Sequence, residues 1–391
     1  AARAEQARTY SPGSLRPETA RALYGAELHF SSSRIDVLAG CRFAHFLQYG
    51  LRAQEREPAE FDSRFYGTFV HDVLEHVVQQ TEREGGFAAV PRSRVQELAQ
   101  ERMEQNAQTL LETFPDSGRT GYLLRRTFDE VTQVVDELYD ELSVSAFRPE
   151  FCELEFSARG ALPGVAFAGE RCRGVVEGFV DRVDVWQSGG RPYVRVVDYK
   201  TGRKSFDYTN VLHGRGLQML LYLFALVRLG GHLLHGEPLP AGVLYFPARI
   251  ERVSVRDRLA QAEIEKERRK QLRRSGVLLN SDPVLEAMEP CGGSPRFLPY
   301  TLDKEGRKTG DLASFAQLAQ LERFVFRTVA ALGDELADGR IDPDPCIRDA
   351  KDSACAFCPY SEVCAGHEQP RWLKKITAEE FWQTLERREH G

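Results

Sequence analysis

The chain has 391 residues, of which 42% are hydrophobic and 28% charged, and its formal net charge is −6. This length allows a sizeable buried core in one to three domains, and the composition is that of an ordinary soluble globular protein. No apolar run reaches the length of a membrane span, so no membrane partner is expected. The negative charge argues against a uniformly basic surface but is compatible with a local basic groove.

The eight cysteines are the first guide to the compartment in which the chain works. The N-terminal sequence AARAEQARTY lacks the pattern of a secretory signal peptide. Without secretion, clustered cysteines are better explained as metal ligands than as disulfides. The sequence therefore predicts a reducing, cytoplasmic location.

The N-terminal third is expected to be mostly helical. Residues 1–28 are irregular apart from a helical patch at residues 17–24, which predicts a linker or extension before a domain at 29–391. Ser33 is the expected N-cap of a helix that contains Cys41. The next expected helix runs from Gly67 to about residue 84 and carries His71 among apolar neighbours, where a histidine is more often a core residue than a ligand. Two helices without an assigned chemical role are then predicted at residues 92–113 and 121–145.

The central feature of the sequence is a predicted β-hairpin, with strands at residues 174–186 and 193–199 around a turn-forming segment. Because alternate strand residues share a face, Asp198 and Lys200 point the same way, and Asp181 lies on one face of the first strand. Carboxylates are expensive in an apolar strand unless they share a ligand. Asp181 and Asp198 are therefore candidate ligands for Mg²⁺ or Mn²⁺, although a D-x-K pair alone is common on protein surfaces.

The segment after the hairpin begins with a predicted helix in which Gln218 and Tyr222 share one face. A polar pair on an apolar helix needs partners in any case, so this spacing alone does not prove a functional site. A strand at residues 242–247 and a charged helix at 249–274 follow. That helix is either solvated or binds a nucleic-acid backbone. Residues 275–312 are expected to be a loop-rich insertion, followed by a helix at 312–339.

A second cluster of candidate ligands lies in residues 342–366, where Cys355, Cys358 and Cys364 have the spacing C-x2-C-x5-C. Three close thiols in a turn-rich segment indicate a soft metal centre that needs a fourth donor. Cys346 would complete a local zinc site, whereas Cys41 would complete a site that joins the two ends of the chain. The residues alone leave both alternatives open.

Five separated motifs resemble one branch of the PD-(D/E)xK nucleases, which includes RecB-like, AddB-like and Cas4-like enzymes. They are G-x-x-x-H at 67–71, G-x-x-D at 178–181, VVDYKTG at 196–202, Q-x-x-x-Y at 218–222 and C-x2-C-P-Y-x3-C at 355–364. The segments SGVLLNSDPVLEAME and RFLPYTLDKEGR are similar to AddB proteins in particular. The chain is thus identified as resembling the C-terminal nuclease domain of an AddB-like subunit of AddAB helicase–nucleases.

This resemblance implies an α/β fold with a mixed central β-sheet flanked by helices, a restriction-endonuclease-like core and an iron–sulfur staple. It also implies a Mg²⁺- or Mn²⁺-dependent deoxyribonuclease that hydrolyses single-stranded DNA delivered by a helicase during double-strand-break processing. The implied metal ligands are His71, Asp181, Asp198 and the Tyr199 carbonyl. The implied catalytic residues are Asp181, Asp198, Lys200, Gln218 and Tyr222.

The implied cofactor at the cysteines is a [4Fe–4S] cluster on Cys41, Cys355, Cys358 and Cys364, with zinc on Cys346 and the last three as the alternative. The implied partners are DNA and an AddA-like helicase–nuclease subunit. Two other functions compete with this hypothesis: a non-catalytic module that binds DNA ends, and a stand-alone Cas4-like nuclease. The complete set of motifs argues against the first, and the large helical segment and insertion argue against the second.

Overall fold

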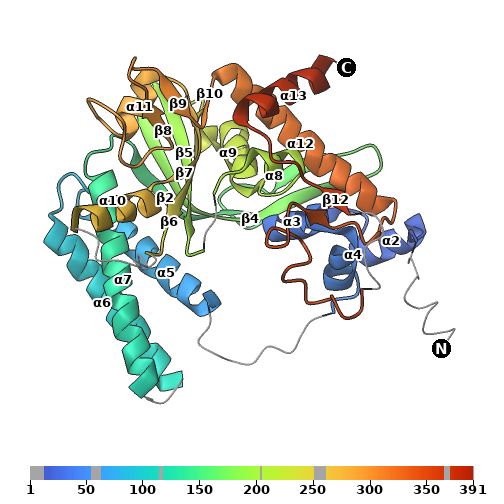
Figure 1. The fold of residues 1–391 in the computed structure, drawn as a ribbon, viewed down its shortest axis with the longest axis horizontal. Helices are drawn as coiled ribbons and strands as arrows, with labels where there is room; N and C mark the ends of the chain where they lie inside the picture. Colours follow the sequence, from blue (N-terminus) through green and yellow to red (C-terminus); the bar gives the residue numbers. More distant parts are fainter. Residues whose placement is uncertain are drawn as a thin grey trace.

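The computed structural model describes residues 13–53, 63–113, 118–202, 205–250, 261–364 and 370–390. These residues form an α/β fold in which helices flank a mixed central β-sheet (Figure 1), as predicted. Three parts of the predicted features lie outside the described residues. They are residues 1–12 of the linker, 251–260 of the charged helix and 365–366 of the cysteine-rich segment.

The central sheet of the described chain has eight strands, and β4 pairs with four of them. The order is β1-β4-β5-β6-β7-β10, and β2 and β3 also pair with β4. The β4–β5 pair is antiparallel, whereas β5 and β6 are parallel, so the sheet is mixed. Its strands are β1 (Leu28–Ser31), β2 (Arg148–Phe156), β3 (Val165–Ala168), β4 (Arg173–Ser188), β5 (Arg191–Lys200), β6 (Leu239–Pro247), β7 (Ser275–Leu279) and β10 (Leu312–Ala313).

Two small sheets and the helices complete the described fold. The small sheets are β8 (Tyr300–Leu302) with β9 (Lys308–Gly310), and β11 (Cys346–Ile347) with β12 (Arg371–Trp372). The helices are α2 (Pro17–Tyr24), α3 (Ser32–Gly40), α4 (Arg42–His45), the π-helical turn Phe46–Gly50, α5 (Ser63–Arg83), α6 (Arg92–Thr113), α7 (Gly118–Leu142), α8 (Tyr208–Leu212), α9 (Gln218–Leu229), the 3₁₀ turn Gly230–His232, α10 (Gln261–Leu272), α11 (Asp282–Met288), α12 (Phe315–Ala337) and α13 (Ala378–His390).

The β4–β5 hairpin closes through two glycines. Gly189 and Gly190 have φ values of +59° and +76°, the left-handed conformation that two-residue hairpin turns require. The pairs Val183–Val196 and Val185–Val194 set the register of the two strands. Two residues beyond the Val183–Val196 pair, the same register places Asp181 opposite Asp198.

Different helices cover the two faces of this hairpin. α9 packs on β5 and β6, and its residues 219–226 are all buried, as expected for a helix that is apolar all round. α7 lies on the other side, because its Glu141 forms an ion pair with Arg195, whose side chain alternates with those of Val194 and Val196. α5 packs on β2 and α6, and α6 packs on α7 (Figure 1). Each fully buried Leu or Phe side chain in these layers contributes about 1.5–3 kcal/mol.

Several local expectations differ from the structure. The N-cap of α3 is Ser31 and not Ser33, because the Ser31 hydroxyl accepts a hydrogen bond from the Arg34 backbone N–H at 3.2 Å. Cys41 does not lie within that helix but separates α3 from α4, with an extended backbone. The range 275–312 was expected to be loop-rich, yet its β7 joins the central sheet. Residues 17–24 form α2 as expected, and two of its residues belong to the core, so the domain boundary at residue 28 stays a prediction.

Candidate active site and cysteine cavity

The two aspartates of the predicted motifs lie side by side where β4 and β5 meet. Asp198 is 5% exposed, and 13% of the Asp181 side chain is exposed. One Asp181 carboxylate oxygen, Oδ2, accepts a hydrogen bond from the Tyr199 backbone N–H at 2.7 Å. This bond holds the carboxylate against the end of β5, next to Asp198.

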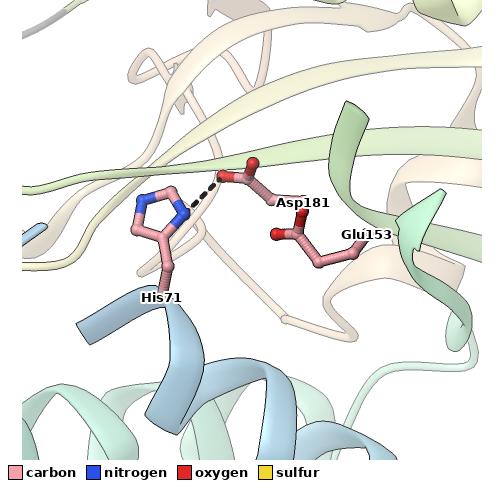
Figure 2. Close-up of side chains that lie close together, drawn as sticks. All are labelled: His71, Glu153 and Asp181. Carbon is pink, nitrogen blue, oxygen red and sulfur yellow. Dashed lines mark ion pairs between the residues drawn. The ribbon is translucent and has the colours of Figure 1, made fainter. Parts of the chain in front are cut away.

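His71 reaches this pair from α5, so the structure places it at the predicted site and not in the core. Its Nδ1 lies 3.5 Å from Asp181 Oδ2 (Figure 2). Its other ring nitrogen, Nε2, lies 2.8 Å from the Tyr199 carbonyl oxygen and donates its proton there. A histidine held in this way by a backbone carbonyl presents its second nitrogen as a metal ligand. The Tyr199 carbonyl, predicted as a ligand itself, therefore orients His71 in this structure.

Glu153 on β2 is a third acidic residue at the site, and no local sequence pattern singles it out. The β2–β4 register pairs Cys152 with Arg182 and Leu154 with Val180, which puts Glu153 opposite Asp181. Its φ of +48° is unusual for a residue other than glycine. Such strained conformations gather at functional sites. Figure 2 shows the Glu153 side chain next to Asp181.

His71, Glu153 and Asp181 fit a divalent cation. One potential ligand atom from each lies within 4.8 Å of the others. Oxygen donors with one imidazole nitrogen suit Mg²⁺ or Mn²⁺. Asp198, predicted as a ligand, lies outside this group of three, although its carboxylate faces Asp181.

The pKa values of the carboxyl groups at the site also favour a bound cation. Burial, followed by the charge of Asp198, raises the pKa of Asp181 to about 7. Burial also raises the pKa of Glu153, and Glu75 adds to this effect. Burial is the main cause of both shifts, and neighbouring carboxylates add to it; a bound cation would offset both effects.

Lys200 is the last residue of β5 and lies at the predicted place beside Asp198. Its ammonium nitrogen Nζ forms an ion pair with Asp198 Oδ2, and 24% of the lysine side chain is exposed. This ion pair brings a positive charge next to the two aspartates of the site.

Gln218 and Tyr222 occupy the first two turns of α9, beneath the same site. Tyr222 is buried, stacks on Phe156 with ring centroids 5.0 Å apart and donates a hydrogen bond to the Glu177 carbonyl oxygen at 3.4 Å. Burial raises its pKa to about 12, and the charges of Asp198 and Asp181 contribute. Tyr222 therefore packs beneath the strands with almost none of its side chain exposed to solvent. Gln218 is half-buried at the start of the same helix.

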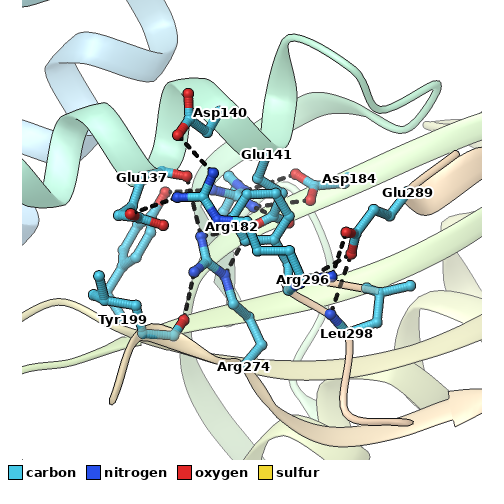
Figure 3. Close-up of polar contacts among 12 residues, drawn as sticks. Glu137, Asp140, Glu141, Arg182, Asp184, Tyr199, Arg274, Glu289, Arg296 and Leu298 are labelled. Atoms are coloured by element: carbon cyan, nitrogen blue, oxygen red, sulfur yellow. Dashed lines mark hydrogen bonds and ion pairs between the residues drawn. The ribbon is translucent and has the colours of Figure 1, made fainter. Parts of the chain in front are cut away.

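The opposite face of the hairpin holds a buried network of charges (Figure 3). Asp184 accepts hydrogen bonds from Arg182 at 2.7 and 3.0 Å and from Arg195 at 2.7 and 3.0 Å. Glu141 of α7 pairs with Arg195 and Arg274 at 3.1 and 2.8 Å. Arg182 also donates to the Tyr199 hydroxyl at 3.0 Å, so the network anchors the residue whose backbone orients Asp181 and His71.

The four cysteines predicted to hold a cluster line one cavity of about 160 Å³. Cys41 comes from the junction of α3 and α4, and the others come from the segment after β11. The cavity wall is mostly apolar and includes Phe43. Burial raises the pKa of Cys41 to about 11, and burial and the charges of Cys358 and Cys364 raise that of Cys355. All four cysteines therefore line one mostly apolar pocket, although they come from two segments far apart in the sequence.

Cys346, the alternative fourth ligand, is not among the residues that line this cavity. It is fully buried in β11, and its thiol donates a hydrogen bond to the Ala39 carbonyl at 3.4 Å. Two arginines join the segments on either side. Arg371 donates to the Ala39 carbonyl at 2.6 Å, and Arg42 pairs with Asp344 at 3.0 Å. Segments about three hundred residues apart in the sequence thus meet beside the cavity.

The fold and this set of residues define a nuclease core, and comparison with known families gives the same class. The profile of the PD-(D/E)XK nuclease superfamily matches residues 29–365, and the chain belongs to that superfamily.

Among curated proteins, the chain is similar to the B subunits of the ATP-dependent helicase/deoxyribonuclease of several bacteria. It is 34% identical to that of Moorella thermoacetica over 357 residues, which is 90% of this chain and 31% of the relative. It is 30% identical to that of Thermoanaerobacter sp. (strain X514) over 379 residues, 93% of this chain and 33% of the relative. The chain therefore spans about a third of the length of these relatives. No helix in the described part is long and apolar enough to cross a membrane.

Proposed function

We propose that this chain is the nuclease part of an AddB-like subunit and hydrolyses phosphodiester bonds of single-stranded DNA. The observation that carries this proposal is the group His71, Glu153 and Asp181 beside Asp198 and Lys200. The relatives named as helicase/deoxyribonuclease subunits support DNA as substrate. They also support a helicase–nuclease partner of the AddA kind and, with it, a cytoplasmic setting.

In the proposed mechanism, His71, Glu153, Asp181 and Asp198 would hold Mg²⁺ or Mn²⁺. When bound, such an ion polarises a phosphate oxygen and lowers the pKa of a water ligand. Lys200 orients the attacking water or offsets the charge that develops on the phosphate. Gln218, at the start of α9, lies on the helix face that carries Tyr222 toward the hairpin, where it orients the water or the phosphate. The backbone of Tyr199 positions both Asp181 and His71.

The test is degradation of end-labelled single-stranded DNA with Mg²⁺ by the intact chain and by Lys200→Ala. We expect cleavage by the intact chain and a loss of about 10²–10³-fold in the variant, as when one transition-state donor is removed. Equal cleavage by both would exclude the assigned core. Binding without cleavage by either protein would favour the module that binds DNA ends.

We further propose that Cys41, Cys355, Cys358 and Cys364 hold a [4Fe–4S] cluster with a structural role. Joining segments more than three hundred residues apart restricts the unfolded chain, and such restriction stabilises more for long loops. Cys358→Ala is expected to lose iron and lower the unfolding temperature, whereas Cys346→Ala is expected to keep its iron. Stoichiometric zinc in place of iron, lost in both variants, would favour the alternative site.

A further inference from the structure

A groove of about 470 Å³ opens beside Lys200, and its lining includes none of the carboxylates of the proposed metal site. It lies between the ends of β5 and β6, the helix α10 and the start of β7. Its volume is within the usual range of ligand sites, about 300–1,000 Å³. The charged residues that line it are Lys200, Arg249, Lys270, Arg273 and Glu267.

Positive charge is concentrated in this groove, although the whole chain has a net charge of −6. Arg249 lies over the Tyr66 ring, with its guanidinium carbon 5.0 Å from the ring centroid. Tyr66 precedes His71 on α5, so this stacking ties the groove to the helix that serves the active site. Lys270 is 77% exposed, and its ammonium nitrogen lies 3.9 Å from Glu267, too far for a strong pair.

Two kinds of cationic side chain line the groove: one is held by hydrogen bonds, and the others face solvent. Arg273 donates a hydrogen bond to the Leu298 carbonyl at 3.1 Å and another to the Tyr300 carbonyl, so it holds the groove wall in place. Arg249 and Lys270 also line the groove and are exposed to solvent. Two exposed cations beside Lys200 form a positive path that begins at the proposed cleavage site.

The lining of the groove suits the phosphate backbone of a nucleic acid better than a stacked base. Tyr245, the aromatic residue among the described lining residues, is only 4% exposed and offers no open face for stacking. Phosphate contacts by Lys and Arg position a nucleic acid without reading its sequence.

We propose that this groove binds the sugar–phosphate backbone of the DNA strand next to the cleaved bond, through Arg249 and Lys270. This inference rests on the proposed nuclease function, since Lys200 is shared by both sites. It predicts binding that is independent of sequence and strongly weakened by salt.

The test is the affinity of the full chain for a fluorescent oligo-dT strand at several KCl concentrations, with Ca²⁺ in place of Mg²⁺. The variants are Arg249→Ala and Lys270→Ala, and the control is Arg191→Ala. Arg191 begins β5 and Lys200 ends it, so the control removes an exposed charge about 30 Å from the groove. Each groove variant is expected to bind about 3–10-fold more weakly and to reduce the salt slope by about 0.7, the value for one phosphate contact to a single strand.

The outcomes separate the groove from the nuclease function. If the unchanged chain binds the strand and both groove variants keep the slope of Arg191→Ala, the groove proposal is wrong and the nuclease proposal stands. If the unchanged chain neither binds nor cuts single strands, both proposals fail. Circular dichroism of each variant checks that its fold is intact.

Discussion

The two faces of the β4–β5 hairpin carry charge in opposite ways. On the α7 face, the carboxylates of Asp184 and Glu141 are matched by three arginines, and every pair is buried. On the other face, Asp181 crowds against Asp198 and Glu153, with a histidine and one lysine nearby. Alternate residues of the same two strands therefore contribute to a network in which arginines outnumber carboxylates on one side, and to a site with excess negative charge on the other. We therefore expect the paired charges on the α7 face to stabilise the fold, and the excess carboxylates on the other face to bind a cation.

The largest expected effect comes from removing one carboxylate on the unmatched face. Asp181→Asn keeps the shape of the side chain but removes a candidate metal ligand. Cleavage of single-stranded DNA with Mg²⁺ is expected to fall by about 10³-fold, with an unchanged circular dichroism spectrum. Activity within a few-fold of the unchanged chain would remove Asp181 from the mechanism.

The matching change on the other face is expected to act on stability. Asp184→Asn leaves Arg182 and Arg195 short of a buried negative partner, and breaking such a pair costs about 3–5 kcal/mol. Urea unfolding of this variant measures the loss, with Asp181→Asn as the control, which is expected to be as stable as the unchanged chain or more so. If Asp181→Asn lost more stability than Asp184→Asn, the distinction between the two faces would be wrong.

A smaller effect is expected for Glu153, which can be compared with another glutamate on the same strand. Glu153→Gln is expected to weaken Mn²⁺ binding by at least about 10–100-fold, the loss caused by removing even a residue that only supports a metal ligand. Glu155→Gln is the control, because Glu155 accepts a hydrogen bond from the Ser157 hydroxyl at 2.6 Å instead of facing Asp181. Calorimetry with Mn²⁺ compares the two. Equal affinities would assign the positive φ of Glu153 to strand packing alone.

The smallest effect is on the pH dependence of stability without metal. The pKa of Asp181 is raised from 3.8 to about 7 in the folded chain, so the folded state binds its proton more tightly than the unfolded state. The contribution of this group to stability is therefore present below pH 4 and is lost as the pH rises toward 7. The free energy of unfolding in urea is measured at each pH for the unchanged chain and for Asp181→Asn. The difference between the two values isolates the contribution of Asp181. A difference that does not vary between pH 4 and 8 would contradict the raised pKa.

The sequence predicts much of the difference between the two faces of the hairpin, because alternate residues of a strand point to opposite faces. The glycine pair at residues 189–190 predicts the turn, and the alternation around Asp181 and Asp198 indicates which neighbours share a face with each aspartate. The Q-x-x-x-Y spacing likewise puts Gln218 and Tyr222 on one side of α9. The turn, the strand faces and the helix face depend on residues close together in the sequence, so the sequence alone predicts them.

The remaining features depend on contacts between distant segments. Glu153 and Glu155 have the same sequence parity, and nothing local shows that only Glu153 has a positive φ and reaches Asp181. Spacing alone could not decide between Cys41 and Cys346, whereas the cavity contains Cys41 and leaves Cys346 in β11. The burial of Tyr222 beneath the hairpin also follows only from packing.

Manganese binding to the chain tests the central claim most directly, because it needs neither a partner protein nor a DNA strand. Calorimetric titration with Mn²⁺ is expected to show binding at the hairpin in the unchanged chain and loss of that binding in Asp181→Asn. The affinity is expected to rise with pH up to about 7, as Asp181 loses its proton. Identical titrations of the two proteins would contradict the claim that the unmatched face of the hairpin is a metal site.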